Sequence, residues 1–359
     1  MLRSLTHPSR AALCFGAVAA FAYCLAIGGV SFLREAEIRD HFNLRVESDL
    51  RFRINELNNY RDNITRDLSV FATMRDVREL FPALSSAFDV LGEARVRQLY
   101  IDLNPHPRGK KQDLDEAVDG SSYSKLHGNL HRGFRSQVEM RNYYDFIFLR
   151  SDGRIIYSVG KEDDFGRSVK EAPLEGSVLG RVFARSIDAN PGSIVTEDFA
   201  PYGPSGDGLF QFIGTPVYAR GNVVGVIVIQ ARSELFASVM RTDKSYFSGL
   251  KSYIVNTEGR NLTDPGASVA SVSVGALKGA SGTMRTKGGA GNDVYAAYAP
   301  FDWFGLKWAA VTELDNYIVV GRKYAGVVPL TLLGLICVLF SALAGWLLGE
   351  RDSGSRTSD

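Results

Sequence analysis

Two long stretches of the chain contain no charged residue. They cover residues 11–33 and residues 325–349. A helix needs about 20 apolar residues to cross the hydrocarbon core of a bilayer, so each stretch is long enough to be a transmembrane helix. A cleaved signal peptide is the alternative for the first stretch, but its apolar run is longer than the usual hydrophobic region of such peptides. We therefore predict two membrane anchors.

The charges around the first stretch predict its orientation. Arg3 and Arg10 precede it, and no acidic residue does. Because basic residues favour the cytoplasmic side, we expect residues 1–10 and 350–359 in the cytoplasm and residues 34–324 outside it. Ten residues after the second anchor are too few for an output domain. A cytoplasmic signalling partner on another chain, or a receptor severed from its output domain, is therefore expected.

After the first stretch the apolar residues follow a helical period. From Ile38 to Phe71 they recur every three or four positions, close to the period of a straight α-helix, and no Pro or Gly occurs before Pro82. This predicts a long stalk helix over residues 34–94. The apolar stripe could pack on the rest of the chain or against a second copy in a homodimer, and the pattern does not separate these alternatives.

From Tyr143 the period changes to two, which is typical of strands. Residues 143–149 and 154–159 flank Ser151-Asp152-Gly153, a strand–turn–strand signal. A helix near 178–187 and strands near 193–199, 209–218 and 223–230 follow.

The same order recurs on a smaller scale. A helix near 233–241 precedes a hairpin that turns at Glu258-Gly259, and strands follow near 282–286, 293–299 and 306–313. Together with helices near 93–103 and 123–138, this predicts an α+β fold. Its two antiparallel-sheet modules would cover residues 95–231 and 232–320.

Charge and cysteine content narrow the class of partner and the compartment. Residues 34–324 contain equal numbers of basic and acidic residues, which argues against nucleic acid as a partner. They contain no cysteine, since Cys14, Cys24 and Cys337 all lie in the uncharged stretches. A eukaryotic ectodomain of this size usually carries disulfides, whereas a bacterial periplasmic domain need not. We therefore predict a two-pass protein of the bacterial inner membrane.

Three segments carry a resemblance to a known family. They are YYDFIFLRSDGRIIYSVGKEDDFG (143–166), DFAPYGPSGDGLFQFIGTPVYARGNVVGVIVIQ (198–230) and GNDVYAAYAPFDWFGLKWAAVTELD (291–315). These segments resemble the double Cache (dCache) extracytoplasmic sensor domains of bacterial transmembrane receptors, and the likeness covers nearly all of residues 34–317. It implies a membrane-distal and a membrane-proximal PAS-like module, a small molecule bound by the distal module, and a signal passed through helices to an output domain.

The chain departs from the amino-acid-binding branch of that family. Tyr202 matches the Tyr of its Tyr-x-Asp motif, but Pro204 replaces the Asp, and Gln230 stands where the branch has a terminal Asp. The Arg-x-Trp-Tyr motif of the branch is absent as well. Because an ammonium group needs anionic or carbonyl partners, we expect a small polar metabolite other than an α-amino acid.

A pocket for such a molecule needs aromatic contact area and a few convergent polar groups. Arg181 or Lys161 could hold a carboxylate, Arg181 in bidentate fashion. At each position the alternative is an ordinary surface or strand residue, and Asp198, Tyr202 and Tyr157 are the favoured members of the set. The candidate ligand-binding residues are Tyr144, Tyr157, Lys161, Asp164, Arg181, Asp198, Tyr202 and Gln230.

No motif predicts catalysis, a cofactor or a metal. His127 and His131 stand four residues apart and could share one helix face, but Gly128 occupies the position of a metalloprotease Glu, and no third ligand is evident. No nucleophile-elbow motif occurs, and residues 34–324 contain no Cys nucleophile.

The favoured function is therefore a membrane-anchored periplasmic small-molecule sensor without catalytic activity. One alternative is a structural or assembly membrane protein similar to polysaccharide chain-length regulators. These share the two-span plan and a Pro near the second span, here Pro329. They are built from long coiled helices, so the predicted hairpins argue against this alternative. Another is a ligand-blind ectodomain subunit of a larger complex.

Overall fold

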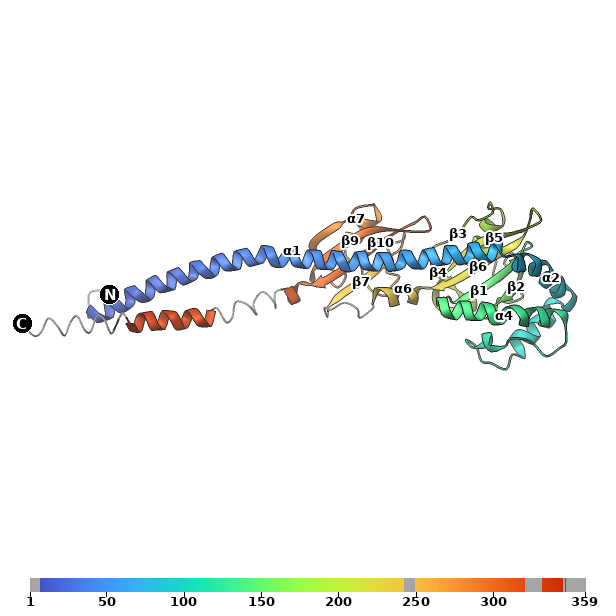
Figure 1. Ribbon diagram of the computed structural model, residues 1–359, viewed down its shortest axis with the longest axis horizontal. Coiled ribbons are helices and arrows are strands. Elements are labelled where there is room, and N and C mark those ends of the chain that lie inside the picture. The colour runs from blue at the N-terminus through green and yellow to red at the C-terminus, as the bar shows by residue number, and fades with distance from the viewer. Residues whose placement is uncertain (1–6, 242–248, 320–330, 345, 347–359) are drawn as a thin grey trace, which may run out of the picture.

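Two sheet modules pack one after the other along a single very long helix (Figure 1). The computed structural model describes residues 7–241, 249–319, 331–344 and 346. Helix α1 (His7–Thr73) runs along both modules, and its C-terminal end reaches the larger one (Figure 1). At 1.5 Å per residue, this helix is about 100 Å long.

The larger, distal module is built around an antiparallel sheet. The strands follow the order β2-β1-β6-β5-β3, and β4 also pairs with β5. The strands are β1 (Asp145–Arg150), β2 (Ile155–Ser158), β3 (Val195–Thr196), β4 (Ala200–Tyr202), β5 (Gly206–Ala219) and β6 (Asn222–Arg232). The helices are α2 (Arg75–Leu91), α3 (Glu93–Arg97), η2 (Gln98–Asp102), η3 (Lys111–Asp113), α4 (Ser122–Arg141), α5 (Val178–Ile187) and η4 (Gly203–Ser205).

The smaller, proximal module repeats this plan with fewer elements. Its sheet has the order β7-β10-β9-β8, and all its strand pairs are antiparallel. Its elements are α6 (Ser233–Met240), β7 (Leu250–Val255), α7 (Val272–Leu277), β8 (Gly282–Lys287), β9 (Asp293–Trp303) and β10 (Leu306–Asp315). The predicted α+β architecture of a helical N-terminal part and two antiparallel-sheet modules is confirmed.

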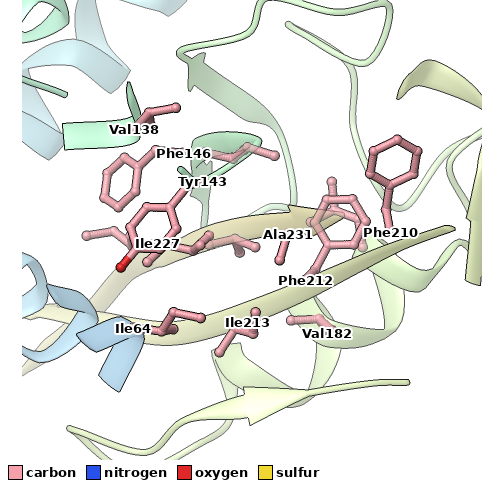
Figure 2. Packing of buried hydrophobic residues seen from close by; sticks show 14 of the residues in the cluster. Ile64, Val138, Tyr143, Phe146, Val182, Phe210, Phe212, Ile213, Ile227 and Ala231 are labelled. Atoms are coloured by element: carbon pink, nitrogen blue, oxygen red, sulfur yellow. The ribbon is translucent and has the colours of Figure 1, made fainter. Parts of the chain in front are cut away.

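Aromatic side chains from several elements fill the core of the distal module. The Phe146 ring stacks on Phe134 of α4 with centroids 4.7 Å apart, and Phe148 stacks on Phe81 of α2 at 5.2 Å. Figure 2 shows that Ile64 of α1 joins the same core. The alternating pattern of β1 therefore places its phenylalanines against helices, as the period of two predicts.

The apolar stripe of α1 packs on the chain's own modules. Phe42, Val46, Leu50, Leu57, Ile64 and Leu68 are all buried in one continuous core. Of the two uses predicted for the stripe, intramolecular packing is the one that the structure shows. A homodimer would have to use another surface.

Two predicted elements differ from the observed ones. The stalk helix predicted for residues 34–94 is divided at Met74, whose ψ of 132° is extended, and α2 then continues through Pro82. The second arm of the predicted Glu258-Gly259 hairpin forms only a single bridge, between Val255 and Asn261. It does not continue as a strand because the Asn261 side chain turns the chain. Its Oδ1 accepts hydrogen bonds from the backbone N–H groups of Thr263 and Asp264.

The predicted first anchor lies within α1, and residues 331–344 of the second are helical. The two segments are neighbours, since a Cβ built on Gly16 would lie 3.5 Å from that of Ala342. Among the helices of the described residues, none meets both the length and the hydropathy expected of a membrane span. Residues 325–330, 345 and 347–349 of the second predicted anchor lie outside the described part of the chain.

Gly225 of β6 tests the packing of α2 on the sheet. A Cβ at this position would lie 2.5 Å from Cζ of Phe81 and would collide with the Leu149 carbonyl. We expect Gly225→Ala to destabilise the chain by about 2 kcal/mol or more, measured as a lower thermal midpoint. Gly133→Ala on α4 is the control, because its Cβ would meet no atom and Ala favours the helix. Equal midpoints for the two variants would contradict this account.

Candidate ligand-binding site

A cleft of about 250 Å³ opens in the distal module beside the start of β1. The 109–112 loop, the C-terminal half of α4, residues 159–162 and the end of β6 form its walls. We call it the distal cleft and define it by Gln112, Arg135, Tyr144, Gly160, Glu162 and Arg232. Of the eight predicted residues, only Tyr144 lines it directly.

A chain of hydrogen bonds runs from the cleft into the sheet. The Tyr144 hydroxyl donates to Oε1 of Glu162 at 2.6 Å, and the Ser205 hydroxyl donates to Oε2 at 2.5 Å. The Gln230 amide donates to Ser205 Oγ at 2.8 Å. Burial raises the pKa of Glu162, against the lowering effect of these hydrogen bonds. The arrangement holds a carboxylate at the wall of the cleft, with one donor just before β1 and the other at the end of η4.

Two guanidinium groups face the same cleft. Arg232 lies over the Tyr144 ring, 4.9 Å from its centroid. Arg135 pairs with Asp115 at 3.2 Å and donates to the Gln112 carbonyl at 3.2 Å. A carboxylate and guanidinium groups therefore line one small space, and they can bind a molecule that carries both hydrogen-bond acceptors and donors.

A fully buried cluster lies directly behind this wall. Lys161 Nζ is 2.8 Å from Nε2 of His131 and 3.3 Å from the Val159 carbonyl. His131 Nε2 is also 2.6 Å from the Gln112 carbonyl, and its Nδ1 is 3.0 Å from the Tyr157 hydroxyl. The Gln112 carbonyl can only accept, so this contact requires the imidazole proton on Nε2, and Nε2 then cannot accept a hydrogen bond from Lys161. In this tautomer Nδ1 accepts from the Tyr157 hydroxyl.

Burial keeps the charges of this cluster low. It lowers the pKa of Lys161 to about 7, and burial together with the Lys161 charge lowers the pKa of His131 to about 3. Asp145 of β1 is buried as well, and burial raises its pKa to about 7. Its carboxylate accepts hydrogen bonds from the Ser158 hydroxyl at 2.5 Å and the Gly160 N–H at 2.8 Å. The wall of the cleft is thus tied to β1 by a carboxyl group that titrates near neutrality.

Asp164 and Tyr202 form a second buried pair on the other side of this loop. The Tyr202 hydroxyl donates to Oδ2 of Asp164 at 2.8 Å, and burial raises the pKa of Asp164 to about 6. Tyr202 also lines a neighbouring surface groove together with Arg97 and Arg167. These two predicted residues therefore lie near the cleft but do not face into it.

The structure does not bring Arg181 and Asp198 to the distal cleft. Arg181 lies exposed on α5 and pairs with Glu197 at 3.5 Å. Asp198 Oδ2 accepts hydrogen bonds from Thr257 Oγ1 at 2.7 Å and Trp308 Nε1 at 3.3 Å, both in the proximal module. Asp198 therefore joins the modules. The ligand-binding role predicted for the eight residues stays a prediction.

The sequence analysis missed four residues of the site, Glu162, Arg232, Arg135 and Ser205. Glu162 is adjacent to Lys161 in the loop that follows the first hairpin, and Arg232 stands two residues after Gln230 on β6. Lys161 and Gln230 were already candidate ligand-binding residues, so the sequence did point to the segments that contain Glu162 and Arg232. Arg135 and Ser205 carry no such signal, because only the folded loop and helix bring them here.

The two histidines of HGNLH do lie on one face of α4, with ring centroids 4.8 Å apart. His127 Nδ1 is 2.7 Å from the Asp115 carbonyl, and both ring nitrogens of His131 also contact protein groups. Within the ranges that the structure describes, no three His, Cys, Asp or Glu side chains come together as metal ligands would.

Solved structures share this architecture. The extracellular domain of a protein described as a histidine kinase, vpHK1S-Z8, aligns with a TM-score of 0.51 at 11% identity, over 80% of this chain and 96% of that one. A domain from Vibrio parahaemolyticus, described as part of a sensory box/GGDEF family protein, aligns with a TM-score of 0.50 at 10% identity, over 79% and 99%. No protein-family model and no curated protein sequence matches the chain.

At these identities the likeness establishes the fold alone. That fold is the one that the dCache resemblance implies, since the chain has the two-module architecture of extracytoplasmic sensory domains. The predicted resemblance is thereby confirmed at the level of fold.

The raised pKa of Asp145 predicts a pH dependence. The folded protein keeps the carboxyl proton up to about pH 7, whereas the unfolded chain releases it near pH 4. The stability that Asp145 contributes is therefore complete below pH 4 and is lost as the pH rises toward 7. Asp145→Asn removes this loss, so its stability relative to the native chain should rise by roughly 2 kcal/mol between pH 5 and pH 7 in urea titrations.

The control for this experiment is Asp293→Asn. Lys287 and Arg285 lower the pKa of the exposed Asp293 carboxyl, so it is ionised in both the folded and the unfolded chain between pH 5 and pH 7. Its stability difference from the native chain should stay constant over that range. A constant difference for Asp145→Asn would show that this carboxyl is already ionised in the folded protein.

Proposed function

We propose that the chain is a non-catalytic, membrane-anchored sensor whose distal cleft binds a small polar molecule. The observation that carries this proposal is the distal cleft itself, in which Glu162, Arg232 and Arg135 surround one space on a sensory-domain fold. A few fixed polar groups in a concave site are typical of small-molecule recognition.

The cleft has a direct connection to the long helix. Tyr143, which lines the cleft, donates its hydroxyl hydrogen bond to Oδ2 of Asp67 on α1 at 2.7 Å. Arg141 of α4 pairs with the same carboxylate at 3.1 Å. A ligand that moves α4 or Tyr143 therefore acts on a buried charge of α1, and α1 extends past the proximal module (Figure 1). This supports transmission along the helix as a change between two packing arrangements.

The proposal includes the location predicted from the sequence. Residues 11–33 and 325–349 would anchor the chain in the bacterial inner membrane, with residues 34–324 in the periplasm. The uncharged composition of both segments and the basic residues at the N-terminus support this topology. A homodimer and a cytoplasmic signalling partner on another chain belong to the same proposal.

A thermal-shift screen of the purified full chain tests the function. Organic acids, amines and purines are the compound classes, and a compound that binds only the folded state must raise the thermal midpoint. We expect Glu162→Gln to change the affinity for the active compound roughly tenfold, because it removes the negative charge of the cleft wall. It should weaken an amine or another hydrogen-bond donor and strengthen an organic acid. Glu171→Gln, on an exposed loop, is the matched control and should bind normally.

Two results would contradict the proposal. The first is a screen without an active compound in any of the three classes. The second is an active compound whose affinity is the same for the native chain, Glu162→Gln and Glu171→Gln, because binding would then occur elsewhere.

A further inference from the structure

The proximal module contains a larger cavity than the distal cleft. It has a volume of about 640 Å³ and lies between β7, the end of α6, the 261–268 loop, the 288–292 loop and β10. We call it the proximal pocket and define it by Ser252, Tyr253, Asn261, Thr263, Asn292 and Glu313. Its volume is in the range of ordinary small-molecule sites.

A buried carboxylate stands in the wall of this pocket. Glu313 of β10 is only 6% exposed, and its Oε1 accepts a hydrogen bond of 2.5 Å from the Tyr253 hydroxyl. Its Oε2 accepts no hydrogen bond from any residue that the structure describes, and no described Lys or Arg pairs with it. Because Glu313 lines the pocket, this oxygen is available there to a cation or another hydrogen-bond donor of a ligand.

The surroundings hold this carboxylate in one place. The Tyr253 oxygen accepts the Ala270 N–H at 2.9 Å, which leaves its own hydrogen for Glu313. On the other side, a Cβ built on Gly288 would lie 2.6 Å from Glu313 Oε2. The glycine therefore gives the carboxylate the space it occupies, and a larger residue there would displace it.

A second polar group of the pocket, the Asn261 side chain, offers a hydrogen-bond donor. Asn261 is buried, and its Oδ1 accepts the N–H groups of Thr263 and Asp264 at 2.9 and 3.0 Å. Among the described residues, no acceptor is found for its Nδ2. The pocket therefore offers a free acceptor at Glu313 and a free donor at Asn261.

We infer that the proximal pocket binds a small organic molecule through a primary ammonium group. Glu313 Oε2 accepts from the ammonium, and Asn261 Nδ2 donates to an oxygen of the same molecule. The site is separate from the distal cleft and does not depend on the function proposed for it. Ser252, in the pocket wall, donates a hydrogen bond to Asp49 of α1 at 3.0 Å. A ligand that displaces Ser252 would therefore alter a contact of the long helix.

Matched pairs of probes test the chemistry. Ethanolamine, 4-amino-1-butanol and β-alanine are compared with ethylene glycol, 1,4-butanediol and 3-hydroxypropionate, in which a hydroxyl replaces the ammonium. Binding to the full chain is measured by thermal shift and by calorimetry, with each probe at up to about 10 mM. We expect at least one ammonium compound to bind and its hydroxyl counterpart to bind at least tenfold more weakly.

Three variants locate the binding. Glu313→Gln keeps the shape and removes the charge, and it should weaken the ammonium probe at least tenfold. Glu258→Gln, exposed in a turn of the same module, is the matched control and should bind as the native chain does. Ala290→Trp fills the mouth of the pocket from an exposed turn position, so it should abolish binding even if Glu313→Gln does not fold.

Each remaining outcome overturns the inference. These outcomes are no binding by any ammonium probe, equal binding by a hydroxyl counterpart, and native affinity in Glu313→Gln or Ala290→Trp. Glu162→Gln in the distal cleft separates the two sites. If it abolishes ammonium binding while Glu313→Gln does not, the ligand belongs to the distal cleft, and the proposed function stands while this inference fails.

Discussion

The buried face of α1 is the constraint on which the rest of the structure depends. Its apolar stripe enters one core with both sheet modules, so neither module can move along the helix without exposing that core. Burying each large apolar side chain contributes about 1.5–3 kcal/mol, which makes the stripe a major source of stability. Three charged groups lie on the same face and set its register. Asp49 and Arg53 pair at 2.7 Å beside the proximal module, and Asp67 is held by the distal one.

These charged groups also connect α1 to the two cavities. Asp67 accepts from Tyr143 at the distal cleft, and Asp49 accepts from Ser252 at the proximal pocket. The modules contact each other as well, through Asp198 and through Trp303, whose indole N–H donates to Gln211 at 2.7 Å. Residues at both cavities therefore have a hydrogen bond to the same helix, and the two modules also contact each other directly.

Most of the fold was predictable because its signals are local. The period of two around Ser151-Asp152-Gly153 located β1 and β2, and the helical period located α4, α5 and α6 close to their observed bounds. The failures have local causes that a pattern of apolar residues does not contain. The Asn261 side chain turns the chain where a second hairpin arm was predicted, and extended backbone at Met74 divides the stalk helix. The site was less predictable, since Arg135 reaches the cleft only because α4 packs against β1.

The sequence by itself determined the two uncharged stretches, the long helical stripe and the two alternating-pattern modules. These are properties of consecutive residues, because periodicity expresses which face of a single element is apolar. Only the tertiary structure decided which polar residues share a cavity. Lys161 became buried against His131, Asp198 became a link between modules, and Glu313 came to line the proximal pocket beside Tyr253. Each of these depends on contacts between residues far apart in the chain, where burial and charge are set by the packing of elements rather than by their own sequence.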